Sequence, residues 1–150
     1  MGNPITILII DDTPGIAALI SRAIQNISPS AHILVANNGQ EGVLLALQHY
    51  PNLIITDLEL AEMDGYELIR ILRHEKYGNQ IRVIGMTGRD SSVVRSNKFR
   101  MLCNEFLLKP FSLNEIREKV STVLGFEKPQ GSVQASADFL KDVLRNGTLG

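Results

Sequence analysis

Five short aliphatic runs, separated by segments long enough to form helices, constrain the fold of this chain more than any other feature. The runs cover residues 5–10, 32–36, 53–56, 82–87 and 105–108. Most of them are almost continuously apolar rather than strictly alternating, which is typical of strands that are covered on both faces. A regular alternation of strands and helices predicts an α/β fold, with a parallel sheet, right-handed crossovers and helices on both faces.

The five intervening segments have helical patterns. They cover residues 16–27, 40–49, 65–74, 91–102 and 112–124. The first has a clean apolar stripe at helical spacing, with Thr13 as its cap and Pro14 at the first helical position. Ser112 and Glu115 form the pattern of a capping box at the start of the last helix, and Gly125 is expected to end it.

The composition is that of an ordinary soluble globular domain, with 150 residues, of which 44% are hydrophobic and 21% are charged. The net charge of −1 gives no support to nucleic-acid binding through the domain as a whole. A single cysteine, Cys103, excludes an internal disulfide and any cysteine-based zinc cluster, and it favours a reducing compartment. No apolar run approaches the length of a membrane span, so we expect a cytoplasmic protein without membrane contacts.

The character of the sequence changes after residue 126. Residues 127–137 contain Pro, Gly, Ser and Gln and are typical of a linker. A short amphipathic helix is expected beyond them, with Phe139, Leu140, Val143 and Leu144 on one face. We therefore predict one domain over residues 5–126, followed by a linker and a short helix over residues 127–150.

Charged and polar side chains stand at the carboxyl ends of the predicted strands. Asp11 and Asp12 follow the first strand, Asp57 follows the third, Thr87 ends the fourth and Lys109 follows the fifth. Open α/β sheets bind ligands at this edge. Clustered carboxylates there suit a hard divalent cation, with Mg²⁺ as the expected ion. Asp57 could then act as a nucleophile toward a phosphoryl group whose charge is neutralised by Mg²⁺ and Lys109.

Each of these residues also has a structural explanation when it is taken alone. Asp11 and Asp12 could cap the following helix, and Asp57 and Lys109 could be ordinary surface residues. The combination of all five at one edge favours a functional site. Four cations in or near the fourth helical segment are typical of a solvated helix face, with partner docking as the alternative. They are Arg89, Arg95, Lys98 and Arg100.

The sequence resembles the receiver domain of two-component response regulators over residues 5 to about 126. Four motifs carry the resemblance: "DD" at 11–12, "DLELAEMDG" at 57–65, "GMTG" at 85–88 and "KPF" at 109–111. No single motif is specific, but their order and intervals together are. The resemblance implies a flavodoxin-like, doubly wound, five-stranded parallel sheet of order 2-1-3-4-5 with five helices.

The resemblance also implies roles for individual residues. Asp57 would accept a phosphoryl group from a phosphohistidine on a sensor histidine kinase or a histidine phosphotransfer protein. Asp12 and Asp57 would bind Mg²⁺ directly together with the backbone carbonyl of Glu59, and Asp11 would support the ion through water. Lys109 would contact the phosphoryl group.

A switch is implied as well, in which Thr87 turns toward the phosphoryl group and Phe106 occupies the aromatic switch position. Phe106 stands where tyrosine is more frequent, so it has no hydroxyl to donate. Glu59 and Arg89 are expected to overhang the site. We predict that they pair across its mouth and slow hydrolysis of the phosphoryl group, with two independently solvated side chains as the alternative.

By the same resemblance the chain would be a signalling module and not an enzyme, although it would catalyse its own phosphorylation and dephosphorylation. It would act through the face made by the fourth helix, the fifth strand and the fifth helix, which would contact a downstream protein or a second copy of the chain. No direct contact with nucleic acid is expected. A stand-alone regulator is the preferred interpretation, and a receiver fragment of a longer regulator is an alternative.

Two enzymatic or cofactor-binding alternatives fit less well. An aspartyl-phosphate hydrolase needs a second acid two residues after the nucleophile, followed by Gly and by Thr or Val, and Glu59 lacks that context. A flavodoxin that binds FMN needs a phosphate loop rich in Ser, Thr and Gly after the first strand, where Asp11 and Asp12 would repel the phosphate. A degenerate receiver that only binds partners is disfavoured by the complete set of acidic residues.

Overall fold

The computed structural model describes residues 4–88 and 92–126 and shows one parallel sheet of five strands. The strands are β1 (Thr6–Ile10), β2 (His32–Ala36), β3 (Leu53–Asp57), β4 (Arg82–Gly88) and β5 (Glu105–Lys109). Their order is β2-β1-β3-β4-β5, and all neighbours are parallel. The predicted flavodoxin-like topology is therefore confirmed.

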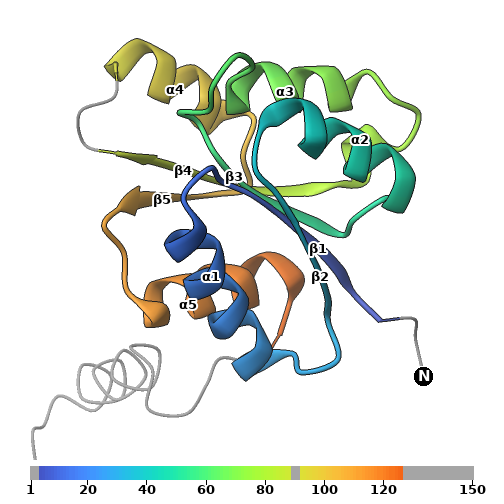
Figure 1. Ribbon diagram of the computed structural model, residues 1–150, viewed down its shortest axis with the longest axis vertical. Helices are drawn as coiled ribbons and strands as arrows, with labels where there is room; N and C mark the ends of the chain where they lie inside the picture. The colour runs from blue at the N-terminus through green and yellow to red at the C-terminus, as the bar shows by residue number, and fades with distance from the viewer. Residues whose placement is uncertain (1–3, 89–91, 127–150) are drawn as a thin grey trace, which may run out of the picture.

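Helices cover both faces of the sheet (Figure 1). They are α1 (Pro14–Ile27), α2 (Gly39–His49), α3 (Gly65–Arg73), α4 (Val93–Met101) and α5 (Leu113–Leu124), with a short 3₁₀ turn, η1 (Gly78–Gln80), before β4. Helices α1 and α5 lie on one face, and α2, α3 and α4 lie on the other. Within the described ranges, every helix is too short or too polar to cross a lipid bilayer. The predicted linker and terminal helix of residues 127–150 fall outside the described residues.

The helices α1 and α5 begin at the predicted cap residues. Ser112 caps α5, because its hydroxyl accepts the N–H of Glu115 at 3.1 Å. Thr13 is the residue before α1, but within the described chain its side chain makes no capping hydrogen bond. Thr13 is thus the N-cap residue with Pro14 after it, as predicted, and its hydroxyl lies 3.4 Å from Asp12 Oδ1.

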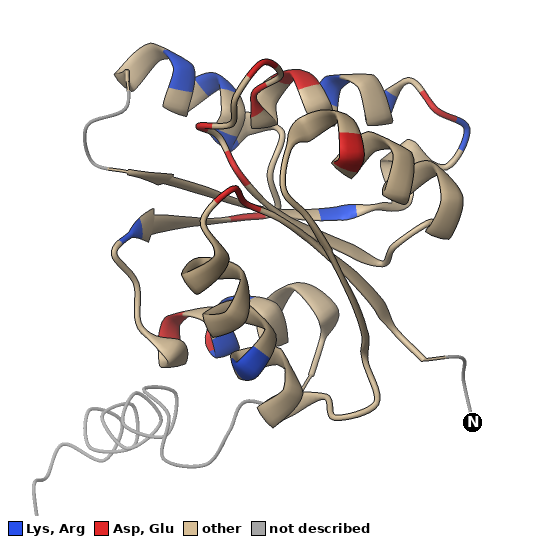
Figure 2. Cartoon of the chain, in the orientation of Figure 1, with Lys and Arg blue, Asp and Glu red and all other residues tan. Residues whose placement is uncertain are grey.

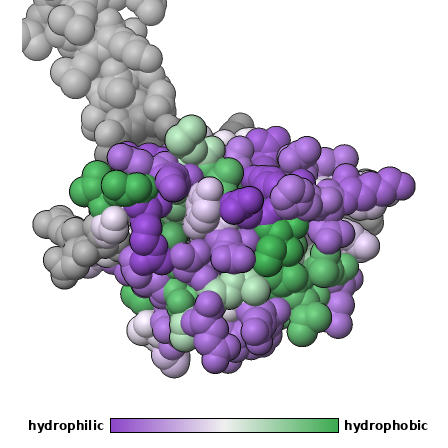
Figure 3. All heavy atoms as spheres, turned by 90° about the horizontal axis from the view of Figure 1, so that it is seen from above, coloured by the Kyte–Doolittle hydropathy of each residue, from purple (hydrophilic) through white to green (hydrophobic). Residues whose placement is uncertain are grey.

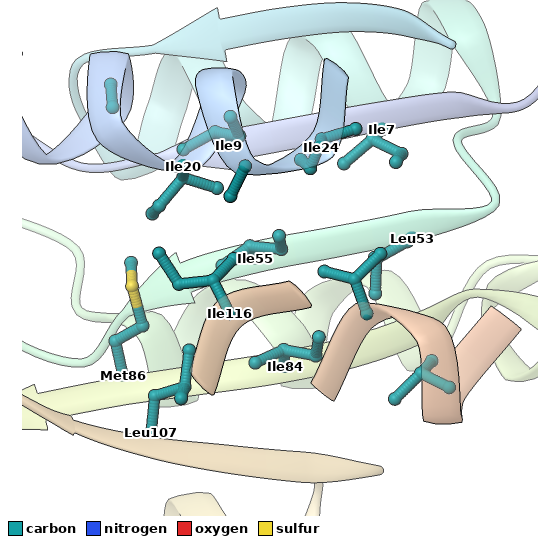
Figure 4. Close-up of a cluster of buried hydrophobic side chains, with 14 residues drawn as sticks. Ile7, Ile9, Ile20, Ile24, Leu53, Ile55, Ile84, Met86, Leu107 and Ile116 are labelled. Atoms are coloured by element: carbon teal, nitrogen blue, oxygen red, sulfur yellow. The ribbon is translucent and has the colours of Figure 1, made fainter. Parts of the chain in front are cut away.

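Each face of the sheet has its own apolar core, which explains why the strands are continuously apolar. Successive side chains of a strand point to opposite faces. Ile7 and Ile9 of β1 pack beneath α1 and α5, whereas Leu8 and Ile10 pack beneath the other three helices. Figure 4 shows the first of these cores, in which side chains from β1, β3, β4 and β5 meet those of α1 and α5. The central strand β3 is buried along its whole length.

Candidate functional site

The predicted site residues converge at the carboxyl edge of the sheet. Strands β1 and β3 are adjacent, and Ile10 pairs with Thr56, so the residues that follow them, Asp11 and Asp57, leave the sheet side by side. The chain order reverses between these two strands, and such switch points are where open α/β sheets bind ligands. Figure 2 shows the acidic segments at the ends of β1 and β3 and a basic residue at the end of β5.

Asp11, Asp12 and Asp57 form a compact carboxylate cluster. Each offers one oxygen, and the three oxygens lie within 4.8 Å of one another. Asp11 and Asp57 are only 1% and 4% exposed, whereas Asp12 is exposed to solvent. A few carboxylates together with water are the ligands that Mg²⁺ prefers. The chemistry and spacing of this cluster therefore fit a hard divalent cation, and the three predicted acids are brought together.

Lys109 bridges the two buried acids. Its Nζ lies 3.0 Å from Asp11 Oδ2 and 2.5 Å from Asp57 Oδ2. Burial works against the charge of Lys109, but its hydrogen bonds to Asp57 and Asp11 outweigh burial and raise the pKa of the ammonium group. Burial raises the pKa of Asp57, against the lowering effects of the hydrogen bond from Lys109 and of the Glu59 backbone N–H. The lysine therefore stays charged and compensates part of the negative charge of the cluster.

The loop after β3 holds Asp57 in place. The backbone N–H of Glu59 donates to Asp57 Oδ1 at 3.0 Å, and that of Gly65 donates to the Leu58 carbonyl at 3.0 Å. A Cβ at position 65 would lie 2.3 Å from the Asp57 carbonyl oxygen, so only glycine lets α3 begin this close to the strand end. This close approach explains the glycine in the motif "MDG".

The proposed switch residues lie on the two neighbouring strands. Thr87 is buried on β4, and its hydroxyl lies 3.5 Å from the Gly88 carbonyl. Phe106 is half-buried on β5, where it pairs with Gly85. Its ring packs edge-on against Phe99 of α4, with 5.8 Å between the ring centroids. The guanidinium of Arg100, also on α4, lies 4.6 Å from the centroid of the Phe106 ring.

The sequence did not identify Arg95 as a site residue. Arg95 Nη1 lies 3.6 Å from Glu59 Oε2, and its Nη2 lies 2.7 Å from Asp64 Oδ2. No sequence motif signals this contact, because it depends on how α4 packs beside α3. Arg89 lies outside the described residues, so its pairing with Glu59 stays a prediction. Arg95 is exposed to solvent, as the prediction of a solvated helix face requires, and it also pairs with these two acids.

Comparisons with known proteins find relatives that match most of this chain. A family model described as the response regulator receiver domain matches residues 7–121. The chain is 28% identical over 141 residues to the response regulator Rre1 of Synechocystis, covering 94% of this chain and 60% of that protein. It is 33% identical over 122 residues to the probable transcriptional regulator ycf29 of Pyropia yezoensis, covering 79% of this chain and 55% of that protein. The chain thus spans between half and two thirds of these relatives.

Solved structures show the same fold. The receiver domain of AraT from Geobacillus stearothermophilus is 27% identical with a TM-score of 0.70, and the match covers 81% of this chain and 93% of that one. A response regulator from Chloroflexus aurantiacus is 22% identical with a TM-score of 0.73, covering 82% and 99% of the two chains. The family model matches residues 7–121, which include every site residue from Asp11 to Lys109 and most of the described chain. This protein therefore belongs to the response regulator receiver domain family of two-component signalling.

Proposed function

We propose that Asp57 accepts a phosphoryl group from a phosphohistidine on a sensor histidine kinase or a histidine phosphotransfer protein. The observation that carries this proposal is the bridge made by Lys109 between Asp11 and Asp57, at 3.0 and 2.5 Å, beside the exposed carboxylate of Asp12. A half-buried lysine aimed at a carboxylate is poised to neutralise phosphoryl oxygens added at that carboxylate.

In the transfer, an oxygen of Asp57 attacks phosphorus, the new O–P bond forms, and the P–N bond to the donor imidazole breaks. The imidazole leaves with the bonding electrons and takes up a proton. Asp11, Asp12, Asp57 and the backbone carbonyl of Glu59 would hold Mg²⁺. When bound, that ion supplies charge neutralisation at the phosphoryl oxygens. Lys109 gives up its contact with the Asp57 carboxylate and turns to the phosphoryl group, while the Glu59 N–H orients the acceptor.

We propose that the signal leaves the domain through the face formed by α4, β5 and α5. Thr87 would turn toward the phosphoryl group, and Phe106 would take a more buried rotamer against Phe99. This face already carries exposed apolar side chains, which suit contact with a downstream protein or with a second copy of the chain. They are Val93, Val94, Met101 and Leu108, which are between 48% and 84% exposed. Figure 3 shows the molecule from above, from the side on which α3 and α4 lie in Figure 1, with apolar patches among hydrophilic side chains.

Acetyl phosphate tests the proposed chemistry. With Mg²⁺ present, the wild-type chain should gain one phosphoryl group, seen as an increase of about 80 Da in intact mass, and hydroxylamine should remove it as it removes any acyl phosphate. Asp57→Asn should gain none. Glu67→Gln is the matched control, because Glu67 is an exposed acid of α3 that does not belong to the carboxylate cluster. Labelling of Asp57→Asn, or no labelling of the wild type, would overturn the proposal.

A second candidate is that the chain is the receiver portion of a longer regulator. The observation in its favour is the length of the relatives, since the chain spans 60% of Rre1 and 55% of ycf29. The apparent mass of the natural product, measured with an antibody against this domain, distinguishes the two candidates. A band near 16.6 kDa would support a stand-alone regulator.

A further inference from the structure

Arg95 joins the first turn of α4 to both ends of the loop that follows β3. One arm of its guanidinium approaches Glu59 at 3.6 Å and the other donates to Asp64 Oδ2 at 2.7 Å. The side chains of Arg95 and Glu59 are 47% and 45% exposed, so charge and hydrogen bonding hold them together rather than burial. Helices α3 and α4 lie side by side in Figure 1, which is what allows a residue of α4 to reach this loop.

Both acids contacted by Arg95 belong to the structure that positions Asp57. The Glu59 backbone N–H donates to Asp57 Oδ1 at 3.0 Å. Asp64 caps α3, because its Oδ1 accepts the N–H of Glu67 at 2.9 Å while its Oδ2 binds Arg95. The guanidinium therefore holds the beginning and the end of one short loop through a single rigid fork.

We infer that Arg95 is a positioning residue that couples α4 to the phosphorylation state of Asp57 through Glu59, by a route separate from Thr87 and Phe106. This inference rests on the proposed function. Phosphorylation replaces one carboxylate charge at Asp57 with a group of about −1.5 to −2. The added negative charge repels the neighbouring Glu59 carboxylate, and Arg95, as a residue of α4, offsets that repulsion through its contact with Glu59.

The coupling has a predicted direction. If the pair of Arg95 and Glu59 strengthens when Asp57 is phosphorylated, then losing Arg95 disfavours the phosphorylated state by the same factor. Without the guanidinium, Glu59 also repels an anionic phosphodonor. We therefore expect Arg95→Gln to slow labelling by acetyl phosphate about two- to fivefold, the size expected of an exposed ion pair. Arg95→Lys keeps the charge but loses the fork, so it should recover only part of the rate.

The experiment compares labelling rates of the full chain, by intact mass, at fixed Mg²⁺ and acetyl phosphate. Lys98→Gln is the control, because it removes the same charge one turn further along α4 and should leave the rate unchanged. Glu59→Gln completes a double-mutant cycle and keeps the backbone carbonyl and N–H of residue 59. In that background Arg95 keeps only its contact with Asp64, so Arg95→Gln should have a clearly smaller effect, which a general effect of charge or folding would not produce.

The outcomes are separable. Slowing by Arg95→Gln but not by Lys98→Gln, together with a smaller slowing in the Glu59→Gln background, supports the inference. Equal rates for Arg95→Gln and Lys98→Gln overturn it, and so does a slowing that persists unchanged when residue 59 is Gln. If the wild type takes up no phosphoryl group, the proposed function fails and the inference fails with it. Circular dichroism melts of all variants exclude unfolding as the cause of a slow rate.

Discussion

At the scale of single residues, the two buried acids, Asp11 and Asp57, use their two carboxylate oxygens in the same way. Asp11 accepts the Thr13 N–H on Oδ1 at 2.7 Å, and Asp57 accepts the Glu59 N–H on Oδ1 at 3.0 Å. Both direct Oδ2 to Lys109. Asp12 differs, because it is exposed and accepts only a long hydrogen bond, of 3.4 Å, from the Thr13 hydroxyl among the described residues. Asp12 is therefore the acid with most of its capacity left for an added cation.

This difference predicts the effect of Asp12→Asn on Mg²⁺ affinity. Removing a charged ligand should weaken binding at least about tenfold, since even indirect partners of metal ligands cost 10–100-fold. Isothermal titration calorimetry measures the affinity directly and does not require phosphorylation. Glu67→Gln serves again as the control, and an unchanged affinity for Asp12→Asn would place the cation elsewhere.

Cys103 gives a second prediction at this scale, on pH dependence. Burial raises the pKa of its thiol from 9.0 to about 12, and the thiol lies 3.2 Å from the Phe99 carbonyl. The folded protein thus holds this proton more tightly than the unfolded chain does. The associated stability is complete below pH 9 and is lost as the pH rises from about 9 toward 12.

Urea unfolding measures this loss. Between about pH 9 and pH 10 the free energy of unfolding of the wild type should fall more steeply than that of Cys103→Ala, by up to about 1.4 kcal/mol per pH unit. Subtracting the free energy of unfolding of Cys103→Ala from that of the wild type removes the contribution of lysines and tyrosines that also titrate in this range. Parallel curves for the two proteins would show that Cys103 titrates normally.

At the scale of secondary-structure elements, α4 is attached to the sheet by little apolar surface. Phe99 is its one fully buried side chain among the described residues, and the rest of the helix is polar or exposed. Phe99 fits because β4 carries a glycine beneath it: a Cβ at Gly85 would lie 2.6 Å from the Phe99 ring and 2.7 Å from Cys103 Sγ. An element held by one aromatic side chain and by ion pairs at its edge is suited to move when the site changes.

Gly85→Ala should therefore destabilise the fold by about 1–3 kcal/mol, because the added methyl group forces the Phe99 ring or the Cys103 sulfur to shift. Gly15→Ala is a matched control on α1, since nothing lies within 4 Å of its added Cβ. That substitution should leave stability unchanged or raise it by about 0.4–1 kcal/mol. Urea unfolding of the three proteins compares them, and equal stability of Gly85→Ala and the wild type would mean that α4 repacks without cost.

At the scale of the whole molecule, the sheet separates two cores and brings the site to one edge between them. The core beneath α1 and α5 includes the buried residues of those two long helices, whereas α4 on the opposite face contributes only Phe99. A change of charge at the carboxyl edge of the sheet should therefore displace α4 before it displaces α1 or α5. We therefore expect the response in α4 and in β5, whose Phe106 contacts Phe99 and Arg100 of α4.

Backbone NMR shifts recorded with Mg²⁺ before and after addition of acetyl phosphate test this assignment. Outside the site itself, the largest changes should occur in α4 (Val93–Met101) and β5 (Glu105–Lys109) and should be small in α1 (Pro14–Ile27). Asp57→Asn should show none of them, which separates phosphorylation from the effects of added salt. Changes concentrated in the second half of α1 would contradict the assignment.

The sequence alone determined the elements, the topology through its family resemblance, and the residues of the carboxylate edge. It could do so because apolar runs, turn residues and the "DD" and "KPF" motifs act locally, and because the carboxyl ends of parallel strands always share an edge. Only the tertiary structure decided that Lys109 bridges Asp11 and Asp57, that Arg95 joins α4 to the loop after β3, and that Phe99 fills the space left by Gly85. Those contacts depend on the rotation and tilt of each helix relative to its neighbours, which no local sequence pattern encodes.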